Sequence, residues 1–247
     1  MRFPRTLIVL SAAAVLFGSA CSDRRREIHE TESTIPLQSA ARAETSFRMS
    51  AGELTLRGGA GSDLMTATFR YNRPQWEPRI DHRVSDGVAR LDVEQRRSGF
   101  VTGHVRNNWE IKLTDRIPLE IRLNLGAGKA IVDLSTLNLT RLDVNMGVGD
   151  LELDASGPRT QNLIGRLKGG IGHATIILPS DIGVRIRVEG GLGSVDGPGF
   201  IREKRVYRNE AYGKTAVSID LDVEAGIGSI DLRLKGVRIL SEGNPSA

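Results

Sequence analysis

Residues 119–128 have the sequence Leu-Glu-Ile-Arg-Leu-Asn-Leu-Gly-Ala-Gly, and the fold class follows from this stretch. Over the first seven residues apolar side chains alternate with polar ones, which is typical of a β-strand with one buried and one solvated face. A Gly-x-Gly then ends the alternation. Because glycine lacks a Cβ atom, it accepts positive φ angles and lets neighbouring backbones approach closely. The stretch therefore predicts a strand that ends at a glycine corner.

The same combination of strand and corner recurs along the second half of the chain. The predicted structural glycines are Gly126, Gly128, Gly147, Gly149, Gly170, Gly172, Gly191, Gly193, Gly226 and Gly228. The first glycines of successive copies are 21, 23, 21 and 35 residues apart. A period near 20 residues is typical of stacked repeats, in which each unit buries its face against its neighbours. We expect the apolar residue between the two glycines to point inward.

These repeats predict an all-β fold, a stacked β-solenoid with Gly-x-Gly corners and no significant helix after the signal peptide. We place the β domain at residues 45–236, with a divergent first part at 45–118 and regular repeats at 119–234. An insertion at residues 198–214 accounts for the one long spacing. The segment Gly58-Gly59-Ala60-Gly61 is interpreted as an earlier, divergent copy of the corner.

The stretches outside this domain have different compositions. Residues 21–44 are polar and charged and are predicted to form a flexible tether, and residues 237–247 a C-terminal tail. Residues 1–20 are predicted to be a signal peptide, because a basic start, an apolar run and the small residues Gly18-Ser19-Ala20 precede Cys21. The apolar run is too short for a membrane-spanning helix, which needs about 20 residues.

The segment Gly18-Ser19-Ala20-Cys21 resembles the lipobox of bacterial lipoproteins, in which the cysteine is acylated after cleavage. Gly18 departs from the pattern, since a branched residue is usual there, and ordinary cleavage that leaves a free thiol is the alternative. With Cys21 as the lipid attachment site, we expect an exported, lipid-anchored protein of the cell envelope. Ser22 favours the outer membrane, with the domain facing the periplasm.

The composition limits the function classes. Cys21 is the single cysteine, so no intramolecular disulfide can form. Removal of the 20-residue signal peptide leaves 227 of the 247 residues and lowers the formal charge from +4 to +2, because Arg2 and Arg5 are lost. Aromatic residues make up 4% of the chain and basic residues alternate with acidic ones, so we expect no nucleic-acid partner.

No catalytic, metal or cofactor site is predicted. Residues 58–66 fit a calcium-binding nonapeptide, but such sites need tandem copies and this one occurs once. The segment Gly126-Ala127-Gly128-Lys129 lacks the further glycine and the hydroxyl residue of a phosphate-binding loop. The four histidines have no metal-site spacing. Carboxylates such as Asp143 and Asp222 alternate with apolar residues, as expected of a solvated sheet face.

The insertion is the candidate partner-binding loop. It concentrates the aromatic and arginine side chains that protein interfaces favour: Phe200, Arg202, Arg205, Tyr207, Arg208 and Tyr212. The alternative interpretation is structural, with the aromatic residues packed back onto the domain or covering its edge.

Several motifs, ordered along the chain, resemble the toast-rack family of bacterial cell-envelope proteins. They are Ala51-Gly52-Glu53-Leu54, Asp63-Leu64-Met65, Trp109-Glu110-Ile111, Leu125-Gly126-Ala127-Gly128-Lys129, Gly190-Gly191-Leu192-Gly193-Ser194-Val195 and Gly226-Ile227-Gly228-Ser229-Ile230. The resemblance implies a stacked all-β rack, similar to adhesins and to domains of cell-wall-stress response proteins. It implies no established chemistry.

Together these features predict a non-catalytic, membrane-anchored cell-envelope binding or scaffold protein, linked to envelope or cell-wall stress, whose partner is an envelope protein or a glycan. One alternative is a carbohydrate-active envelope enzyme, which needs two carboxyl groups about 5–9.5 Å apart in a groove. The other is a polysaccharide-binding adhesin. A solenoid also exposes strand edges at its ends, so we expect homo-oligomers through sheet edges.

Overall fold

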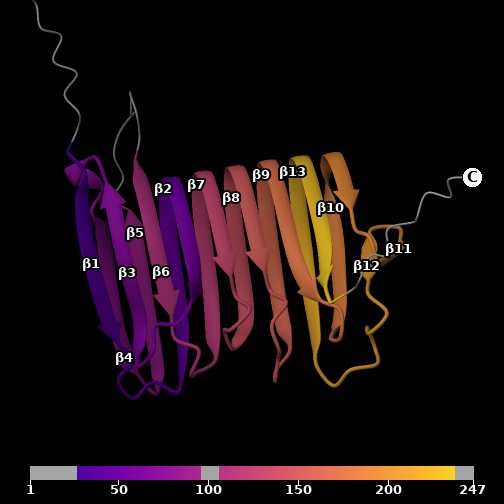
Figure 1. Ribbon diagram of the computed structural model, residues 1–247, viewed down its shortest axis with the longest axis horizontal. Helices are drawn as coiled ribbons and strands as arrows, with labels where there is room; N and C mark the ends of the chain where they lie inside the picture. The colour runs from indigo at the N-terminus through magenta and orange to yellow at the C-terminus, as the bar shows by residue number, and fades with distance from the viewer. Residues whose placement is uncertain (1–26, 96–105, 237–247) are drawn as a thin grey trace, which may run out of the picture.

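The computed structural model describes residues 27–95 and 106–236, which form one 13-stranded β-sheet folded into a long rack (Figure 1). The predicted signal peptide, Cys21 and the predicted C-terminal tail lie outside the described residues. In the described ranges the helical structure is one short 3-10 helix, η1 (Pro74–Trp76), and no helix there is long and apolar enough to cross a membrane. The prediction of an all-β, solenoid-like fold is confirmed.

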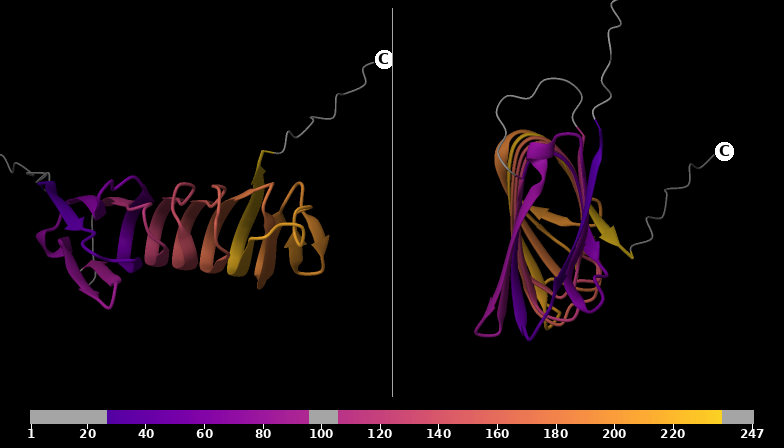
Figure 2. Two further views of the ribbon diagram at one scale, coloured as in Figure 1. Left: turned by 90° about the horizontal axis from the view of Figure 1, so that it is seen from below. Right: turned by 90° about the vertical axis from the view of Figure 1, so that its left-hand side faces the viewer.

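Six long strands form the body of the rack. In spatial order they are β2 (Arg42–Gly58), β7 (Leu119–Asp133), β8 (Leu139–Asp154), β9 (Leu163–Pro179), β13 (Ser218–Lys235) and β10 (Gly183–Asp196). Neighbours pair in parallel along their length. Each strand bends over at its glycine corner, so its first half lies in one layer and its second half in the opposite layer (Figure 2). Alternate side chains from both layers point inward and form one apolar core.

Five further strands close the N-terminal end. β5 (Val88–Gln95) pairs in parallel with the first half of β2 and β6 (Asn107–Leu113) with its second half, so together they complete one more coil. β4 (Pro78–Ser85) pairs with β5, while β3 (Asp63–Tyr71) and β1 (His29–Pro36) extend the sheet beyond β6. The largest side chains of the core, Trp76, Trp109, Phe47 and Phe69, are buried in this end.

The prediction of a flexible tether is wrong over residues 29–36, which form β1, and at its C-terminal boundary, because β2 begins at Arg42. Burial alternates along β1, but three of its four inward-facing residues are polar, so the sequence has no alternation of hydrophobicity to indicate a strand. Pairing with β3 holds it in place. His29 stacks on Tyr71 with 5.6 Å between ring centroids, and the Thr31 and Tyr71 hydroxyls are 3.0 Å apart.

The residue between the corner glycines points outward, so the prediction that it points inward is wrong. Val148, Ile171 and Ile227 are 51%, 54% and 54% exposed. The flanking glycines explain this. A Cβ atom on Gly172 would lie 1.8 Å from the Gly149 carbonyl oxygen of the neighbouring coil, and the φ of Gly172 is +150°. Since the glycines face neighbouring backbone, the residue between them is left on the convex side of the bend.

The first corner lies at residues 51–52, not at the predicted Gly58-Gly59-Ala60-Gly61. Ala51 is in register with Ala127, and Gly52 with Gly128. Residues 58–61 instead form the turn from β2 to β3. Gly59 and Gly61 both have positive φ there, and a Cβ atom on either would meet nothing within 4 Å. Gly59 and Gly61 therefore serve the backbone conformation of the turn, whereas at Gly58 a Cβ atom would lie 2.1 Å from the Thr136 side-chain oxygen.

The last three coils do not stack in chain order, because β13 lies between β9 and β10. The charges of the outer face favour this arrangement. Arg166 of β9 is in register with Asp222 of β13, which is in register with Arg187 of β10. Direct pairing of β9 with β10 in the register of the repeats would place Arg166 opposite Arg187, and like charges directly opposite destabilise a sheet.

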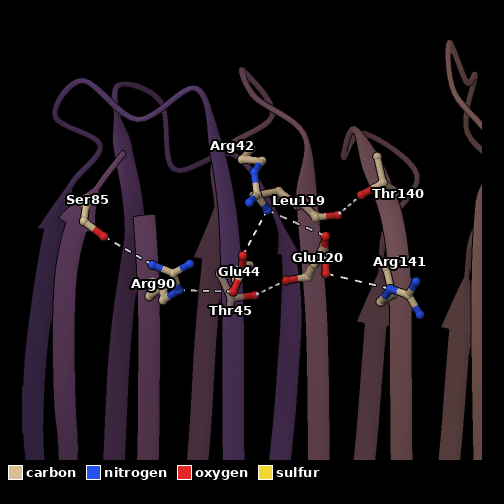
Figure 3. A network of polar contacts seen from close by, with 9 residues as sticks. All are labelled: Arg42, Glu44, Thr45, Ser85, Arg90, Leu119, Glu120, Thr140 and Arg141. Atoms are coloured by element: carbon tan, nitrogen blue, oxygen red, sulfur yellow. Dashed lines mark hydrogen bonds and ion pairs between the residues drawn. The ribbon is translucent and has the colours of Figure 1, made fainter. Parts of the chain in front are cut away.

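Paired charges cover the outer face formed by the first halves of the strands. Figure 3 shows the row nearest the loops, in which Glu44 of β2 lies 2.9 Å from Arg42 and 3.3 Å from Arg90. In the same row Glu120 of β7 lies 3.8 Å from Arg141 of β8. Each of these side chains is at least 36% exposed, so each pair contributes no more than about 1 kcal/mol. The carboxylates of this row are paired with arginines and do not gather into a site.

Candidate functional site

The connection between β10 and β13 folds into a hairpin at the C-terminal end of the rack (Figure 1). It consists of β11 (Ile201–Glu203) and β12 (Val206–Arg208), and β12 pairs with the first half of β10. In the turn between them Lys204 has a φ of +56°, a left-handed conformation that is uncommon for residues other than glycine, asparagine and aspartate. Such strain persists only where the surrounding structure fixes it, and it is concentrated at functional sites.

A buried residue that the sequence analysis missed, Asn209, fixes the hairpin to the rack. Its side-chain oxygen accepts a hydrogen bond from the Val184 N–H at 2.9 Å, and its Nδ2 donates to the Ile182 carbonyl at 2.7 Å. Asn209 is 3% exposed, so its replacement would leave these backbone groups without partners. An asparagine in a polar insertion gives no local signal of this role, because tertiary structure supplies its partners.

Three of the six predicted residues, Arg202, Arg205 and Tyr207, line one cavity at the end of the rack. Tyr207 is 4% exposed and covers the end of the core, and the Arg202 guanidinium lies over its ring, 5.4 Å from the centroid. Arg202, Lys204 and Arg205, here called the cationic turn, are exposed. Among the described residues no acidic side chain comes within 4 Å of their charged groups. The cationic turn therefore presents three uncompensated charges beside the cavity.

The other three predicted residues make structural contacts, one with the core and two within the insertion. Phe200 is half-buried and packs against the core. The Arg208 guanidinium lies 2.9 Å from Glu203 and 5.7 Å from the centroid of the Tyr212 ring. The structural interpretation of the insertion thus applies to these residues and to Tyr207, while the cationic turn remains open to solvent.

The cavity beside the cationic turn has a volume of about 170 Å³. Apolar residues of β10 and β13, among them Val188, Val195 and Ile230, form its inner wall. The Val188 N–H donates to the Arg205 carbonyl at 2.8 Å, which ties the turn to this wall. Within the described part of the chain, β10 has no strand partner on its outer side after Arg187. An apolar wall and a cationic rim therefore meet at an open strand edge.

A second surface is the row of apolar side chains along the outside of the bend. Ala127, Val148, Ile171 and Ile227 occupy this row on four successive strands. Parallel strands lie about 4.8 Å apart, so these side chains form a continuous ridge. A contiguous apolar row on a surface is typical of an interaction site, in contrast to isolated exposed residues.

A groove of about 610 Å³ at the N-terminal end is lined by three carboxylates, Glu32, Glu53 and Glu110, and by threonine and serine hydroxyls. All three carboxylates are exposed. Glu110 is paired with Arg70, and Glu53 accepts a hydrogen bond from Asn108 at 3.0 Å. Glycoside hydrolysis needs one carboxyl group shielded as an acid, and this groove provides no such shielding.

Arg159, a half-buried residue with a perturbed pKa, has a structural role. Burial lowers the pKa of Arg159 to about 10, but its guanidinium donates to the Leu139 and Ala155 carbonyls and so holds the loop between β8 and β9. Throughout residues 27–95 and 106–236, no three histidine, cysteine or acidic side chains are placed to hold a metal ion.

The fold and the end site define a β-rack protein whose distinctive surfaces are an outer ridge and a cationic end. The chain belongs to the toast-rack family, since residues 24–177 match the N-terminal domain of toast_rack, DUF2154. A solved structure from Clostridium sporogenes, described as a putative cell adhesion protein, is 38% identical with a TM-score of 0.82 over 85% of this chain and 100% of that one. A putative adhesin from Bacteroides fragilis is 12% identical with a TM-score of 0.29 over 84% and 97%. Among curated proteins there is no match.

Proposed function

We propose that this chain is a non-catalytic binding module of the bacterial cell envelope and that it engages an envelope component through the C-terminal end of the rack. The observation that carries the proposal is the cationic turn, where Arg202, Lys204 and Arg205 have no acidic partner in the part of the chain that the structure describes and line a cavity with an apolar inner wall. Desolvated contacts with arginine and aromatic residues supply much of the affinity at interfaces. The Clostridium sporogenes relative, named for cell adhesion, supports a binding role.

Anchoring by a lipid on Cys21 is part of the proposal. β1 begins at His29, and eight residues extend at most about 29 Å, so a lipid at Cys21 would hold the N-terminal end of the rack near the membrane. The cationic turn is at the opposite end (Figure 1) and could project into the periplasm from the outer membrane. A Cys21→Ala variant is expected to leave the membrane fraction. Retention there would remove the anchor from the proposal.

A test of the binding role is crosslinking in the native envelope, followed by identification of what co-purifies. Deletion of residues 198–214 would also remove Tyr207 and Asn209, which hold the fold together. We therefore replace only the cationic turn, as Arg202→Ser with Lys204→Ser and Arg205→Ser. The matched control replaces three exposed cations in the N-terminal half of the rack that line neither cavity, Arg83, Arg106 and Arg116.

The expected result is that the triple variant loses at least tenfold of its co-purified partner, while the control variant retains it. Equal recovery from both variants would contradict binding at this end. Recovery of a second copy of this chain would identify association through the open edge of β10. Involvement in envelope or cell-wall stress predicts that the transcript rises on treatment with a cell-wall inhibitor, and an unchanged transcript would remove that link.

The N-terminal groove favours one further candidate, polysaccharide binding. Its hydroxyl and carboxylate lining can form hydrogen bonds with sugar hydroxyl groups. In that case glycan would be recovered equally from the two cation variants. Recovery would fall instead on replacement of Glu53 and Glu110 by alanine.

A further inference from the structure

The inside of the bend is filled in the first half of the rack and hollow in the second. The inner residues that precede the corners of β2, β7 and β8 are Met49, Leu125 and Met146, all buried. In register with them are Gly169 of β9, Ala225 of β13 and Gly190 of β10. A Cβ atom on Gly169 would meet nothing within 4 Å. Space for a larger side chain therefore exists at Gly169, whereas a Cβ atom on Gly190 would lie 2.1 Å from the Ala225 carbonyl oxygen, so the hollow is under β9 and β13.

The missing side chains leave an apolar cavity of about 60 Å³ under the corners of β9 and β13, with walls that include Met146, Leu167 and Val223. Ala225 and Ile230 line both this cavity and the 170 Å³ cavity at the end of the rack. The two spaces therefore adjoin along the inside of the bend. A water-sized group, which is about the size of a methylene, needs roughly 10–15 Å³ of such space, so the two cavities together have more room than an alkyl chain of about ten carbons needs.

The outer end of this space is cationic. Its lining includes the three cations of the cationic turn, Arg202, Lys204 and Arg205. Lys204 has a positive φ in the turn that carries them. A guanidinium binds a carboxylate through charge-assisted hydrogen bonds and can do so with two parallel bonds. An apolar interior that ends at unpaired cations matches a molecule with an alkyl chain and an anionic head.

We propose that the C-terminal end of the rack binds a free fatty acid of about ten carbons, with its alkyl chain under the corners of β13 and β9 and its carboxylate at the cationic turn. This inference rests on the proposed binding role and names the ligand class for the same site. Residues of β9 and β13 line the inner cavity and residues of β13 and β10 line the outer one, so the chain would lie along the inside of the bend and the head at the open edge.

The test is calorimetric titration of the full chain with decanoate below its micelle concentration. We expect one decanoate per chain, and octanoate to bind on the order of tenfold more weakly because two methylene groups leave the apolar space. Decyltrimethylammonium, which has the same chain and a cationic head, is expected not to bind. Equal binding of the anionic and cationic amphiphiles would overturn the proposal.

Two variants locate the site. Gly169→Leu places in β9 the side chain that β7 carries at Leu125. The new side chain should fill the cavity and weaken decanoate binding at least tenfold. The melting temperature should be unchanged or higher. Replacement of the cationic turn by three serines should weaken decanoate binding but not decanol binding, whereas the Arg83, Arg106 and Arg116 control should change neither. Unchanged decanoate affinity in either site variant would overturn the proposal.

The outcomes separate this inference from the broader proposal. The triple-serine variant could lose an envelope partner while the unmodified chain binds no decanoate. That result would support the binding role and exclude a fatty acid as the ligand. Binding of phosphatidylglycerol vesicles without binding of monomeric decanoate would likewise exclude it, because a membrane surface would then be the ligand. Decanoate binding without any envelope partner would retain the site and remove the partner.

Discussion

The Arg185 guanidinium of β10 donates a hydrogen bond to the Asp220 carboxylate of β13 at 2.7 Å. Burial lowers the pKa of Arg185, but the hydrogen bond to Asp220 and the charge of Asp220 together have the larger effect, so the pKa of Arg185 is raised overall. The contact joins two strands separated by the whole insertion. It marks the position of β13, which enters the rack between β9 and β10.

A double-mutant cycle with Arg185→Gln and Asp220→Asn is expected to give a coupling energy of about 0.5–1 kcal/mol, measured by urea unfolding. The two side chains are 38% and 26% exposed, so the coupling should decrease in high salt. The Lys168–Glu224 pair, at 45% and 47% exposure, is the control and should couple more weakly. No measurable coupling between Arg185 and Asp220 would contradict this assignment.

Asp222→Arg is expected to destabilise the protein by about 0.5–1 kcal/mol, because it would place three arginines in one cross-strand row with Arg166 and Arg187. Glu152→Arg is the matched control, since its neighbours in register are Ile131 and Thr175. Equal unfolding midpoints for the two variants would argue against the spatial order in which β13 separates β9 from β10.

Replacement of Ile171 or Ile227 by serine is expected to change the free energy of unfolding by less than about 0.5 kcal/mol, because both side chains lie on the outer ridge. Leu221→Ala, which empties a buried position of β13, should cost about 2–5 kcal/mol. A cost of several kcal/mol at Ile171 would show that the residue between the corner glycines packs inward after all.

Gly172→Ala is expected to cost more than about 4 kcal/mol or to prevent folding, because the new Cβ atom would overlap the Gly149 carbonyl oxygen at a strained φ. Gly169→Ala, three residues earlier in the same strand, meets no atom and should change stability by less than about 1 kcal/mol. Thermal unfolding of both variants measures the contrast. Similar melting temperatures would refute the role assigned to the corner glycine.

The free energy of unfolding is expected to fall at mildly acidic pH because of His82. Burial lowers the pKa of His82, so the folded state binds a proton less readily than the unfolded chain, in which histidine titrates near about 6.5. This stability is present above about pH 6.5 and is lost as the pH falls through that value towards the folded-state pKa. In His82→Gln the decrease should be smaller between pH 7.5 and 5, and an unchanged decrease would exclude His82 as its source.

The local pattern predicted the repeated part of the rack well and its N-terminal end poorly. Leu119, Ile121, Leu123 and Leu125 alternate with polar residues, and all four are buried. β1 lacked such a signal because its inward face is largely polar and its stability comes from pairing with β3. In the insertion the arginines and tyrosines were visible in the sequence, but the role of Asn209 was not, because its partners come from the turn between β9 and β10 and from the start of β10.

The alternation and the repeated glycines were sufficient to predict the class of fold. The alternation reflects the buried and solvated faces of a single strand, and the glycines reflect the close backbone of the next, similar coil. The order of β9, β13 and β10, the outward ridge at Ile171 and Ile227, and the hollow at Gly169 depend on which coil lies beside which. Contacts between distant segments fix these features. Their energies arise only when the strands are side by side, so no local pattern contains them.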